Sequence, residues 1–320
     1  AACILEQLHY LLEQVVASPD QSVHAYSLVT PPTRHLLPDP TQVIAEPWQE
    51  PVPATILALE ERTPERPAVR QGERVWTYRD LCDSARGIAA SLIRQGVNPG
   101  GVVAVTGPRS FGLVAGIVGV WLAGDVLLTL DPELPPERRR LMLREAGARS
   151  VLQVVQRGHA GPDVEGAAHL QVTTVDADTG MPVIPASMEA SPVVRDVSPD
   201  APAYIFFTSG TTGVPKAVLG CHKGLSHFLR WQRQTFGIGP EDRCGLLTGL
   251  SFDMVLRDLF LPLTGGGTLC LPGDDEGLAP ERVLDWLDQE QITVLHAVPT
   301  RAQHWLNNCR EGTRLRRLRW

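Results

Sequence analysis

The chain has 320 residues, of which 43% are hydrophobic and 20% charged, a composition typical of about two globular domains rather than of a disordered chain. Its 29 Lys and Arg residues are outnumbered by 36 Asp and Glu residues, and the net charge of −7 argues against general nucleic-acid binding. The six cysteines form no CxxC pair, which argues against a zinc site or a disulfide framework and is typical of a reducing compartment.

The start of the chain lacks the basic and apolar segments of a secretory signal. The longest apolar run, 111–124, ends at Asp125 and is shorter than the roughly 20 residues that a membrane-spanning helix needs. We therefore expect a buried helix over this run, no membrane partner and a cytoplasmic protein.

The first periodic segment is an amphipathic helix over residues 4–16, which Pro19 ends. Its apolar stripe has no partner element nearby in the sequence, so we expect residues 1–20 to be the last helix of an upstream domain. Seven prolines follow between residues 31 and 53, and such a segment cannot form long regular elements. We expect residues 21–54 to be a semi-rigid interdomain linker.

Short apolar strands alternate with amphipathic helices from about residue 55 onward. This alternation indicates an α/β fold in which helices flank layered, largely parallel sheets. The expected strands are 68–70, 74–77, 102–105, 126–130, 151–155, 171–175, 203–207 and 216–219, and the expected helices are 81–96, 111–123, 135–146 and one that begins at His222.

Less regular segments complete the chain. Residues 176–202 have little apolar periodicity, and we expect a surface loop there. Two further strand–helix units run to Arg310. The alternating residues 315–320 indicate a strand entering a sheet, so we expect the chain to be interrupted at this point rather than to end naturally.

A run of hydroxyl and glycine residues follows the strand 203–207, namely Thr208, Ser209, Gly210, Thr211, Thr212 and Gly213, with Lys216 shortly after. Glycines let backbone N–H groups turn towards an anion, hydroxyl groups add donors and a lysine adds positive charge. The spacing is neither that of a P-loop nor that of a dinucleotide-binding GxGxxG turn. The alternative is an ordinary polar hairpin loop, but the preceding strand and the Pro-Lys pair favour phosphate binding.

Segment 208–216 resembles the phosphate loop of acyl-adenylate-forming enzymes, and specifically that of the adenylation domains of nonribosomal peptide synthetases. The chain departs from the family pattern at Ala217, directly after this loop, where Gly is usual and where we expect the change to be tolerated. It also departs at Asp80, within the first of the motifs named next, where Glu is usual. Three further segments resemble family motifs in order and spacing: Trp76-Thr-Tyr-Arg-Asp-Leu81, Leu122-Ala-Gly-Asp-Val-Leu-Leu-Thr-Leu-Asp-Pro132 and Ser251-Phe-Asp-Met254.

The resemblance also implies a domain plan. Residues 1–20 are similar to the end of a condensation-type domain, residues 21–54 to the linker that follows it, and residues 55–320 to part of the large N-terminal subdomain of an adenylation domain. Residues 36–41 (Leu-Leu-Pro-Asp-Pro-Thr) also resemble the start of the adenylation domain of fungal aminoadipate reductases.

What the resemblance implies chemically is amino-acid activation. An amino acid and Mg²⁺-ATP form aminoacyl-AMP and pyrophosphate, and the acyl group passes to the phosphopantetheine thiol of a carrier protein. The implied partners are the amino-acid substrate, the carrier protein and the condensation domain of the parent synthetase. The loop 208–213 and Lys216 would hold the ATP phosphates. His222 and His227 lack the HExxH spacing, so no metal ligand is assigned.

Four residues match substrate-contacting positions of the family: Asp253, Met254, Arg257 and His296. Asp253 would pair with the α-ammonium group, because a buried ammonium needs an anion. The alternatives are a helix N-cap at Asp253, a solvated i,i+4 ion pair with Arg257, and a core histidine at 296. An Arg257 without a partner would favour a polar or acidic substrate such as aminoadipate or glutamate. Pairing of Arg257 with Asp253 or Asp258 would remove that argument.

The later motifs of the family, which contact adenine and ribose, are missing, and no catalytic residue is assigned because the family's catalytic lysine belongs to an absent C-terminal subdomain. Two hypotheses follow: the chain is part of an adenylating enzyme, or it is a non-catalytic nucleotide-binding or scaffold fragment. A third is the adenylation part of an aminoadipate-reductase-like carboxylate reductase. We expect ATP–pyrophosphate exchange by this chain alone to be near zero.

Overall fold

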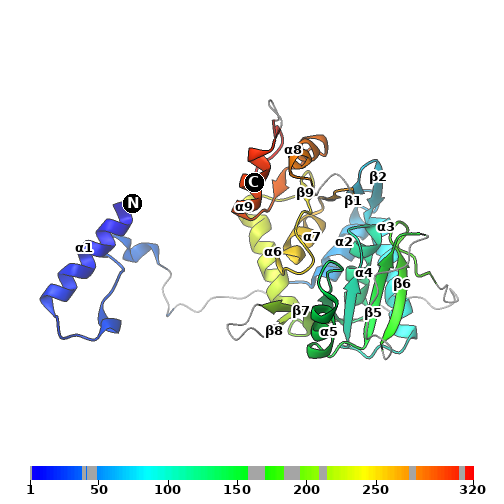
Figure 1. Ribbon diagram of the computed structural model, residues 1–320, viewed down its shortest axis with the longest axis horizontal. Coiled ribbons are helices and arrows are strands. Elements are labelled where there is room, and N and C mark those ends of the chain that lie inside the picture. Colours follow the sequence, from blue (N-terminus) through cyan, green and yellow to red (C-terminus); the bar gives the residue numbers. More distant parts are fainter. Residues whose placement is uncertain are drawn as a thin grey trace. The chain divides into compact units, whose positions relative to one another are not determined.

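The computed structural model describes residues 2–37, 41, 49–157, 170–183, 195–208, 215–273, 279–309 and 314–320. The chain forms two compact units, Ala1–Pro47 and Trp48–Trp320, which we describe separately (Figure 1). Within the described residues, no helix combines the length and the apolar composition needed to cross a membrane.

The N-terminal unit contains the predicted amphipathic helix, α1 (Ala2–Ala17), followed by the 3₁₀ turns η1 (Val23–Ala25) and η2 (Pro31–Leu36). The Gln14 side chain ties α1 to the returning chain, because its amide nitrogen donates to Ser27 O (2.8 Å) and its oxygen accepts from Ser27 N (3.0 Å). Six apolar side chains of α1 are exposed: Ile4, Leu5, Leu8, Leu12, Val15 and Val16. Two short turns thus interrupt the predicted linker, whose residues 38–40 and 42–48 lie outside the described residues.

The second unit begins before the predicted boundary at residue 55. Helix α2 spans Val52–Arg62, and both Val52 and Ile56 are fully buried. Pro53 lies in the first turn, where proline costs no hydrogen bond because the first N–H groups of a helix have no intrahelical partner. Residues 52–54 therefore belong to the globular fold and not to the linker that their proline content predicted.

A six-stranded sheet carries the order β6-β5-β3-β4-β7-β8. Its neighbours are parallel except for the antiparallel pair β7 and β8. The strands are β3 (Val102–Thr106), β4 (Val126–Thr129), β5 (Ser150–Val155), β6 (Gln171–Asp176), β7 (Pro202–Thr208) and β8 (Lys216–Cys221).

A five-stranded sheet carries the order β11-β9-β10-β1-β2 and is parallel except for the antiparallel pair β1 and β2. The strands are β1 (Pro67–Gln71), β2 (Arg74–Thr77), β9 (Arg243–Gly245), β10 (Thr268–Leu271) and β11 (Val294–Leu295). The prediction of layered, largely parallel sheets flanked by helices is confirmed.

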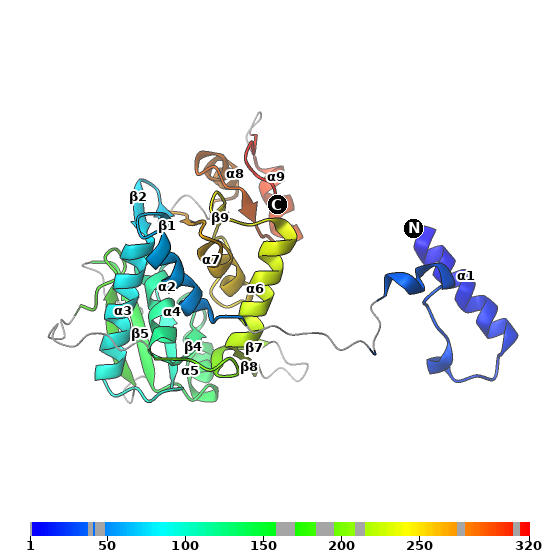
Figure 2. The same cartoon turned by 180° about the vertical axis from the view of Figure 1, so that it is seen from behind.

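Helices form layers between and outside the two sheets (Figures 1 and 2). The central layer packs apolar residues from both sheets into one core, and it consists of α2, α3 (Tyr78–Arg94), α4 (Phe111–Leu122), α6 (His222–Phe236) and α7 (Met254–Gly265). Helix α5 (Pro136–Glu145) covers the outer face of the six-stranded sheet. Helices α8 (Pro280–Gln289) and α9 (Pro299–Asn307) pack on the outer side of the five-stranded sheet.

Helix α4, predicted from the apolar run, is buried over its whole length. Gly119 allows this packing, because a Cβ there would lie 2.9 Å from Ala85 O on α3. Trp121 fills the centre and donates its indole N–H to Ala203 O on β7 (2.7 Å). The absence of polar residues from 111–122 therefore reflects burial between sheets, as expected from its length.

Helix α3 begins with a capping box at Thr77 and Asp80. The Thr77 hydroxyl accepts from Asp80 N (3.2 Å), and the Asp80 carboxylate accepts from Thr77 N (2.8 Å). This reciprocal pair satisfies two N–H groups at the helix start. Asp80 thus fills the place where Glu is usual, with its shorter side chain.

Residues 314–320 do not form the predicted strand. They lie beside β11, where Leu295 N donates to Trp320 O (3.0 Å) and Arg319 N donates to Thr293 O (2.8 Å). The guanidinium of Arg319 binds both carboxylate oxygens of the buried Asp242 at 2.9 and 3.0 Å. Side-chain anchoring, together with these few backbone bonds, holds this segment to the sheet edge.

Candidate active site at the carboxyl ends of the two sheets

The loop between β9 and α7 lies where the carboxyl ends of both sheets meet. From the six-stranded sheet, the Thr129 hydroxyl donates to Leu250 O (2.7 Å), and Asp131 accepts from the Ser251 hydroxyl (3.2 Å). From the other side, Arg301 on α9 donates to Leu247 O (3.2 Å). Ligands of α/β folds bind outside the carboxyl ends of parallel strands, so this loop marks the candidate site.

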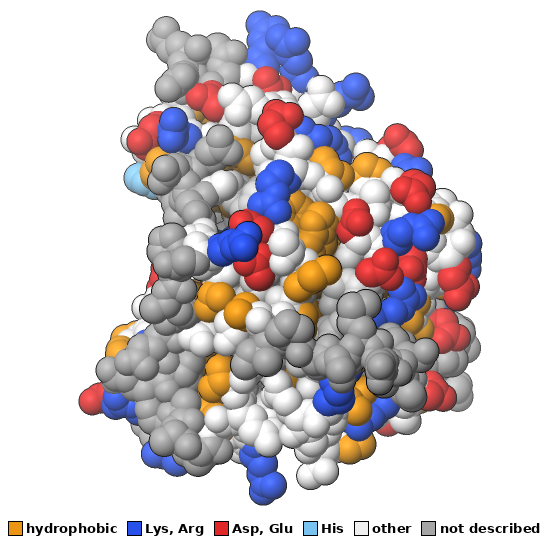
Figure 3. Space-filling model, turned by 90° about the vertical axis from the view of Figure 1, so that its right-hand side faces the viewer, with side chains coloured by type: hydrophobic (Ala, Val, Ile, Leu, Met, Phe, Trp, Pro, Cys, Tyr) orange, Lys and Arg blue, Asp and Glu red, His pale blue; other side chains and the backbone are white. Residues whose placement is uncertain are grey.

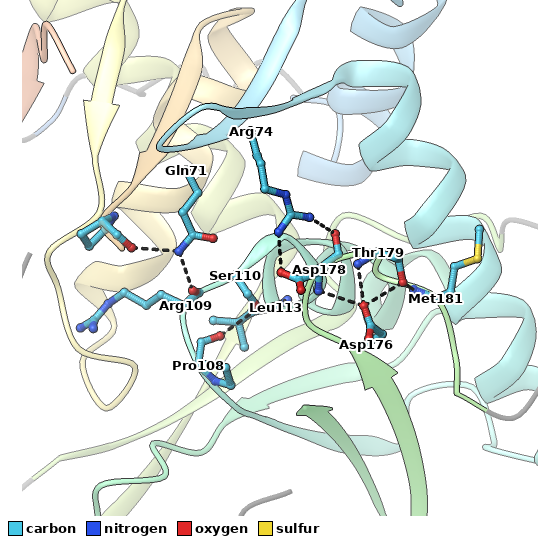
Figure 4. Close-up of polar contacts among 11 residues, drawn as sticks. Gln71, Arg74, Pro108, Arg109, Ser110, Leu113, Asp176, Asp178, Thr179 and Met181 are labelled. Carbon is cyan, nitrogen blue, oxygen red and sulfur yellow. Dashed lines mark hydrogen bonds and ion pairs between the residues drawn. The ribbon is translucent and has the colours of Figure 1, made fainter. Parts of the chain in front are cut away.

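A group of hydrogen bonds and an ion pair between the two sheets lies next to this loop (Figure 4). Gln71 at the end of β1 donates to Arg109 O (3.2 Å) and Pro272 O (2.9 Å). Arg74 on β2 donates to the carboxylate (2.5 Å) and the carbonyl (2.8 Å) of Asp178, which follows β6. These bonds fix the orientation of one sheet relative to the other at the edge where the site lies.

Arg109 is a residue of this region that the sequence reasoning missed. Its guanidinium points away from Arg74 and Asp178 in Figure 4 and donates to Thr248 O (3.2 Å). Burial lowers the pKa of Arg109, the nearby positive charge of Arg301 lowers it further, and Asp131 opposes both. The signal available in the sequence was an arginine directly after a buried strand, preceding the wholly apolar helix α4.

The predicted phosphate loop connects β7 to β8. Thr208 and Lys216 end and begin these strands and face each other in the antiparallel register, so the prediction of neighbouring strands is confirmed. Both residues are exposed. Ser209, Gly210, Thr211, Thr212 and Gly213 lie outside the described residues, and phosphate binding by the loop stays a prediction.

Gly220 on β8 is required by its neighbour Tyr204 on β7. The two residues are partners in the register, and a Cβ at Gly220 would overlap the Tyr204 ring. We expect Gly220→Ala to lower the free energy of unfolding by about 2 kcal/mol, because the ring would have to move. Urea unfolding measures this change. Gly224→Ala on α6 is the control, since its new Cβ would meet only Cys221 Sγ at 3.8 Å; an equal loss in both variants would contradict the prediction.

Asp253 and Met254 lie at the start of α7, as the motif predicts. Asp253 occupies the N-cap position, and its carbonyl accepts from Leu256 N (3.0 Å), but its carboxylate makes no capping hydrogen bond. The side chains of both residues are exposed. The capping alternative thus holds for the backbone of Asp253 and not for its carboxylate.

Arg257 and His296 come together on a residue that the prediction did not include among the site residues. Asp258 Oδ1 accepts from Arg257 Nε (2.9 Å) and lies 3.0 Å from His296 Nδ1, and Asp258 Oδ2 accepts from the Thr248 hydroxyl. The Arg257 side chain is 11% exposed, so the alternative of a solvated ion pair with Asp253 is wrong. Because Arg257 pairs with Asp258, the argument for an acidic substrate from an unpaired arginine no longer applies.

Comparison with known proteins decides the family. The sequence profile of the family described as AMP-binding enzyme matches residues 58–320. This chain belongs to the AMP-binding enzyme family.

Relatives of this chain include the dimodular nonribosomal peptide synthase of Bacillus subtilis, 31% identical over 83% of this chain and 11% of that protein. The L-2-aminoadipate reductase large subunit of Penicillium chrysogenum is 28% identical over 94% of this chain and 23% of that protein. The nonribosomal peptide synthetase FmoA3, solved bound to AMPPNP, superposes with a TM-score of 0.75 at 26% identity over 96% of this chain and 32% of that chain. The predicted resemblance is confirmed, and this chain spans a minor part of each relative.

Proposed function

We propose that this AMP-binding enzyme is part of an ATP-dependent ligase that activates an amino acid as aminoacyl-AMP. The observation that carries the proposal is the exposed Thr208–Lys216 pair at the mouth of the polar loop, in a chain whose family profile covers residues 58–320. An aminoadipate-reductase-like enzyme would begin with the same adenylation step, so the proposal applies to it as well.

Each candidate residue has a role in this proposal. The loop 208–213 and Lys216 would bind the ATP phosphates through backbone N–H groups, hydroxyl groups and one positive charge. Asp253 would bind the substrate ammonium group: its carboxylate is exposed and has no hydrogen bond to other described residues. Met254, Arg257 and His296 would contact the substrate side chain.

The reaction joins the amino acid to the nucleotide. The substrate carboxylate would attack the α-phosphorus of ATP and displace pyrophosphate, and the acyl group would then pass to the phosphopantetheine thiol of a carrier protein. Mg²⁺ would enter with ATP. The described residues contain no group of three His, Cys, Asp or Glu side chains placed to hold a metal, and we assign the ion no protein ligand. The chain's own contribution is to bind and orient both substrates.

The exposed apolar side chains of α1 support the proposal that a partner domain packs against this helix, and we propose that this partner is a condensation domain. A carrier protein is the second partner. The six cysteines are free thiols, which supports a reducing, cytoplasmic setting. On the face of the molecule shown in Figure 3, acidic and basic side chains are interspersed, which does not favour a nucleic-acid partner.

Lys216 tests the proposed function. In the protein that carries the complete adenylation domain, we expect Lys216→Ala to slow ATP–pyrophosphate exchange about 100-fold, because the variant loses a positive charge beside the phosphates. Lys216→Arg keeps the charge and should retain more activity. Lys216 is exposed at the start of β8, so folding should be unaffected in either variant, which circular dichroism verifies.

Unchanged exchange and ATP affinity in Lys216→Ala would remove this residue from the mechanism. A complete domain that binds ATP but shows no ATP–pyrophosphate exchange with any amino acid would instead support the hypothesis of a non-catalytic nucleotide-binding scaffold. This 320-residue chain alone is expected to show exchange near zero.

A further inference from the structure

Asp258 is a buried carboxylate in the middle of the candidate substrate side-chain site. Its side chain is 1% exposed, it accepts hydrogen bonds from Thr248 in the β9–α7 loop and from its neighbour Arg257 on α7, and it lies 3.0 Å from His296 Nδ1 after β11. A buried carboxylate without partners would cost several kcal/mol, so this arrangement depends on the β9–α7 loop and on the segment after β11 keeping their places beside α7.

Arg257 and His296 each face Asp258 with only one side of the side chain. Arg257 donates through Nε, and its terminal nitrogens make no hydrogen bond within the part of the chain that the structure describes. His296 Nδ1 lies 3.0 Å from Asp258 Oδ1, and the negative charge of the carboxylate favours a proton on Nδ1 over a lone pair there. In a neutral imidazole, the opposite ring atom, Nε2, is then an acceptor. The His296 side chain is 24% exposed, so it retains surface for another contact.

We propose that Asp258 is a positioning residue for substrate recognition: it fixes the orientation of Arg257 and the tautomer of His296, and it balances the charge of Arg257. The inference rests on the proposed function, since it assumes that Arg257 and His296 contact the substrate side chain. It deepens that proposal by naming the substrate class as amino acids whose side chain ends in a polar acceptor group, either a carboxylate or an amide.

A substrate side chain that ends in an amide and one that ends in a carboxylate differ in the charge that they bring to Arg257 and Asp258. With Arg257 neutralised by Asp258, an amide adds no charge and can both accept from Arg257 and donate to His296 Nε2. A carboxylate adds a negative charge and needs a proton on His296 Nε2 as its partner. Removal of the Asp258 charge leaves one positive charge unbalanced and should shift preference towards the carboxylate.

The first test is the tautomer of His296, measured in this chain by long-range ¹H–¹⁵N correlation spectra at about pH 8, where an ordinary imidazole is neutral. His296→Gln assigns the signal. We expect wild-type His296 to carry its proton on Nδ1 and Asp258→Ala to lose that preference. Thr248→Val, which removes only the third donor, should keep it. A wild-type proton on Nε2 overturns the proposal without any variant having to fold.

The second test is ATP–pyrophosphate exchange by the complete adenylation domain, with L-glutamate, L-2-aminoadipate, L-glutamine and L-leucine as probes. We expect Asp258→Asn to raise the kcat/KM ratio of glutamate to glutamine about tenfold, mainly through KM, because it removes a charge and leaves the volume unchanged. Asp83→Asn, at an exposed ion pair with Arg86 on α3, is the matched control and should leave the ratio unchanged.

The outcomes separate the two proposals. An unchanged glutamate-to-glutamine ratio, or leucine as the preferred substrate in wild type and variant alike, overturns the role of Asp258 in recognition. Absence of exchange with every amino acid in the wild type contradicts the proposed function, and the substrate class named here falls with it. The tautomer of His296 still reports in that case whether Asp258 positions this side chain.

Discussion

Acidification from about pH 6.5 to about pH 4 is expected to lower the free energy of unfolding of this protein by about 3 kcal/mol through His222 alone. His222 begins α6, is 1% exposed and lies edge-on to the Trp121 ring at 5.7 Å. Burial lowers its pKa from 6.5 to about 4, because the charged imidazole loses its hydration there. Its Nδ1 is buried without a hydrogen-bond partner among the described residues.

The direction follows from proton binding. Between these two pH values the unfolded chain binds a proton at His222 that the folded chain does not, so acid favours unfolding. Urea unfolding at a series of pH values measures the effect, with His222→Phe as the comparison, because phenylalanine keeps the ring contact with Trp121 and cannot titrate. His227→Phe, at an exposed position of α6, is the control. Equal acid sensitivity of the wild type and His222→Phe would contradict the prediction.

Asp125→Asn is expected to stabilise the protein by about 3 kcal/mol at about pH 8. Asp125 lies between α4 and β4, is 1% exposed, and neither carboxylate oxygen has a hydrogen-bond partner among the described residues. Burial raises its pKa from 3.8 to about 7, and the charge of Arg195 opposes this only in part. At pH 8 the folded protein therefore holds a buried negative charge, which the asparagine removes.

The pH dependence of the Asp125 effect is opposite in sign to that of His222. Between pH 3.8 and about 7 the folded state binds a proton at Asp125 that the unfolded state does not, so stability falls as pH rises. The gain from Asp125→Asn should thus disappear near pH 4. Thermal unfolding of both proteins from pH 4 to about pH 8 measures it, and Asp200→Asn at an exposed site is the control. A gain independent of pH would exclude the charge as the cause.

Local patterns were sufficient for most of the fold. The apolar run at 111–122 and the short strands at 68–70 and 74–77 are short-range features, since their periodicity or hydrogen bonds lie within a few residues. The predicted α/β layers follow from these features because each amphipathic face needs a sheet to cover it. The exceptions are α2, where a proline marked a helix start rather than a linker, and residues 314–320, where alternation did not produce a strand.

Sequence by itself determined the α/β class, the strands β7 and β8 on either side of the polar loop, and the family resemblance that the comparisons confirm. Only the tertiary structure decided what Arg257 contacts. Its partner could have been Asp253, Asp258 or a substrate, and all three were compatible with the spacing along α7. The choice depends on Thr248 and His296, which follow two different strands and reach Asp258 only after the sheet has formed. Helical periodicity carries no information about such contacts, because they join segments that are adjacent in space and distant in sequence.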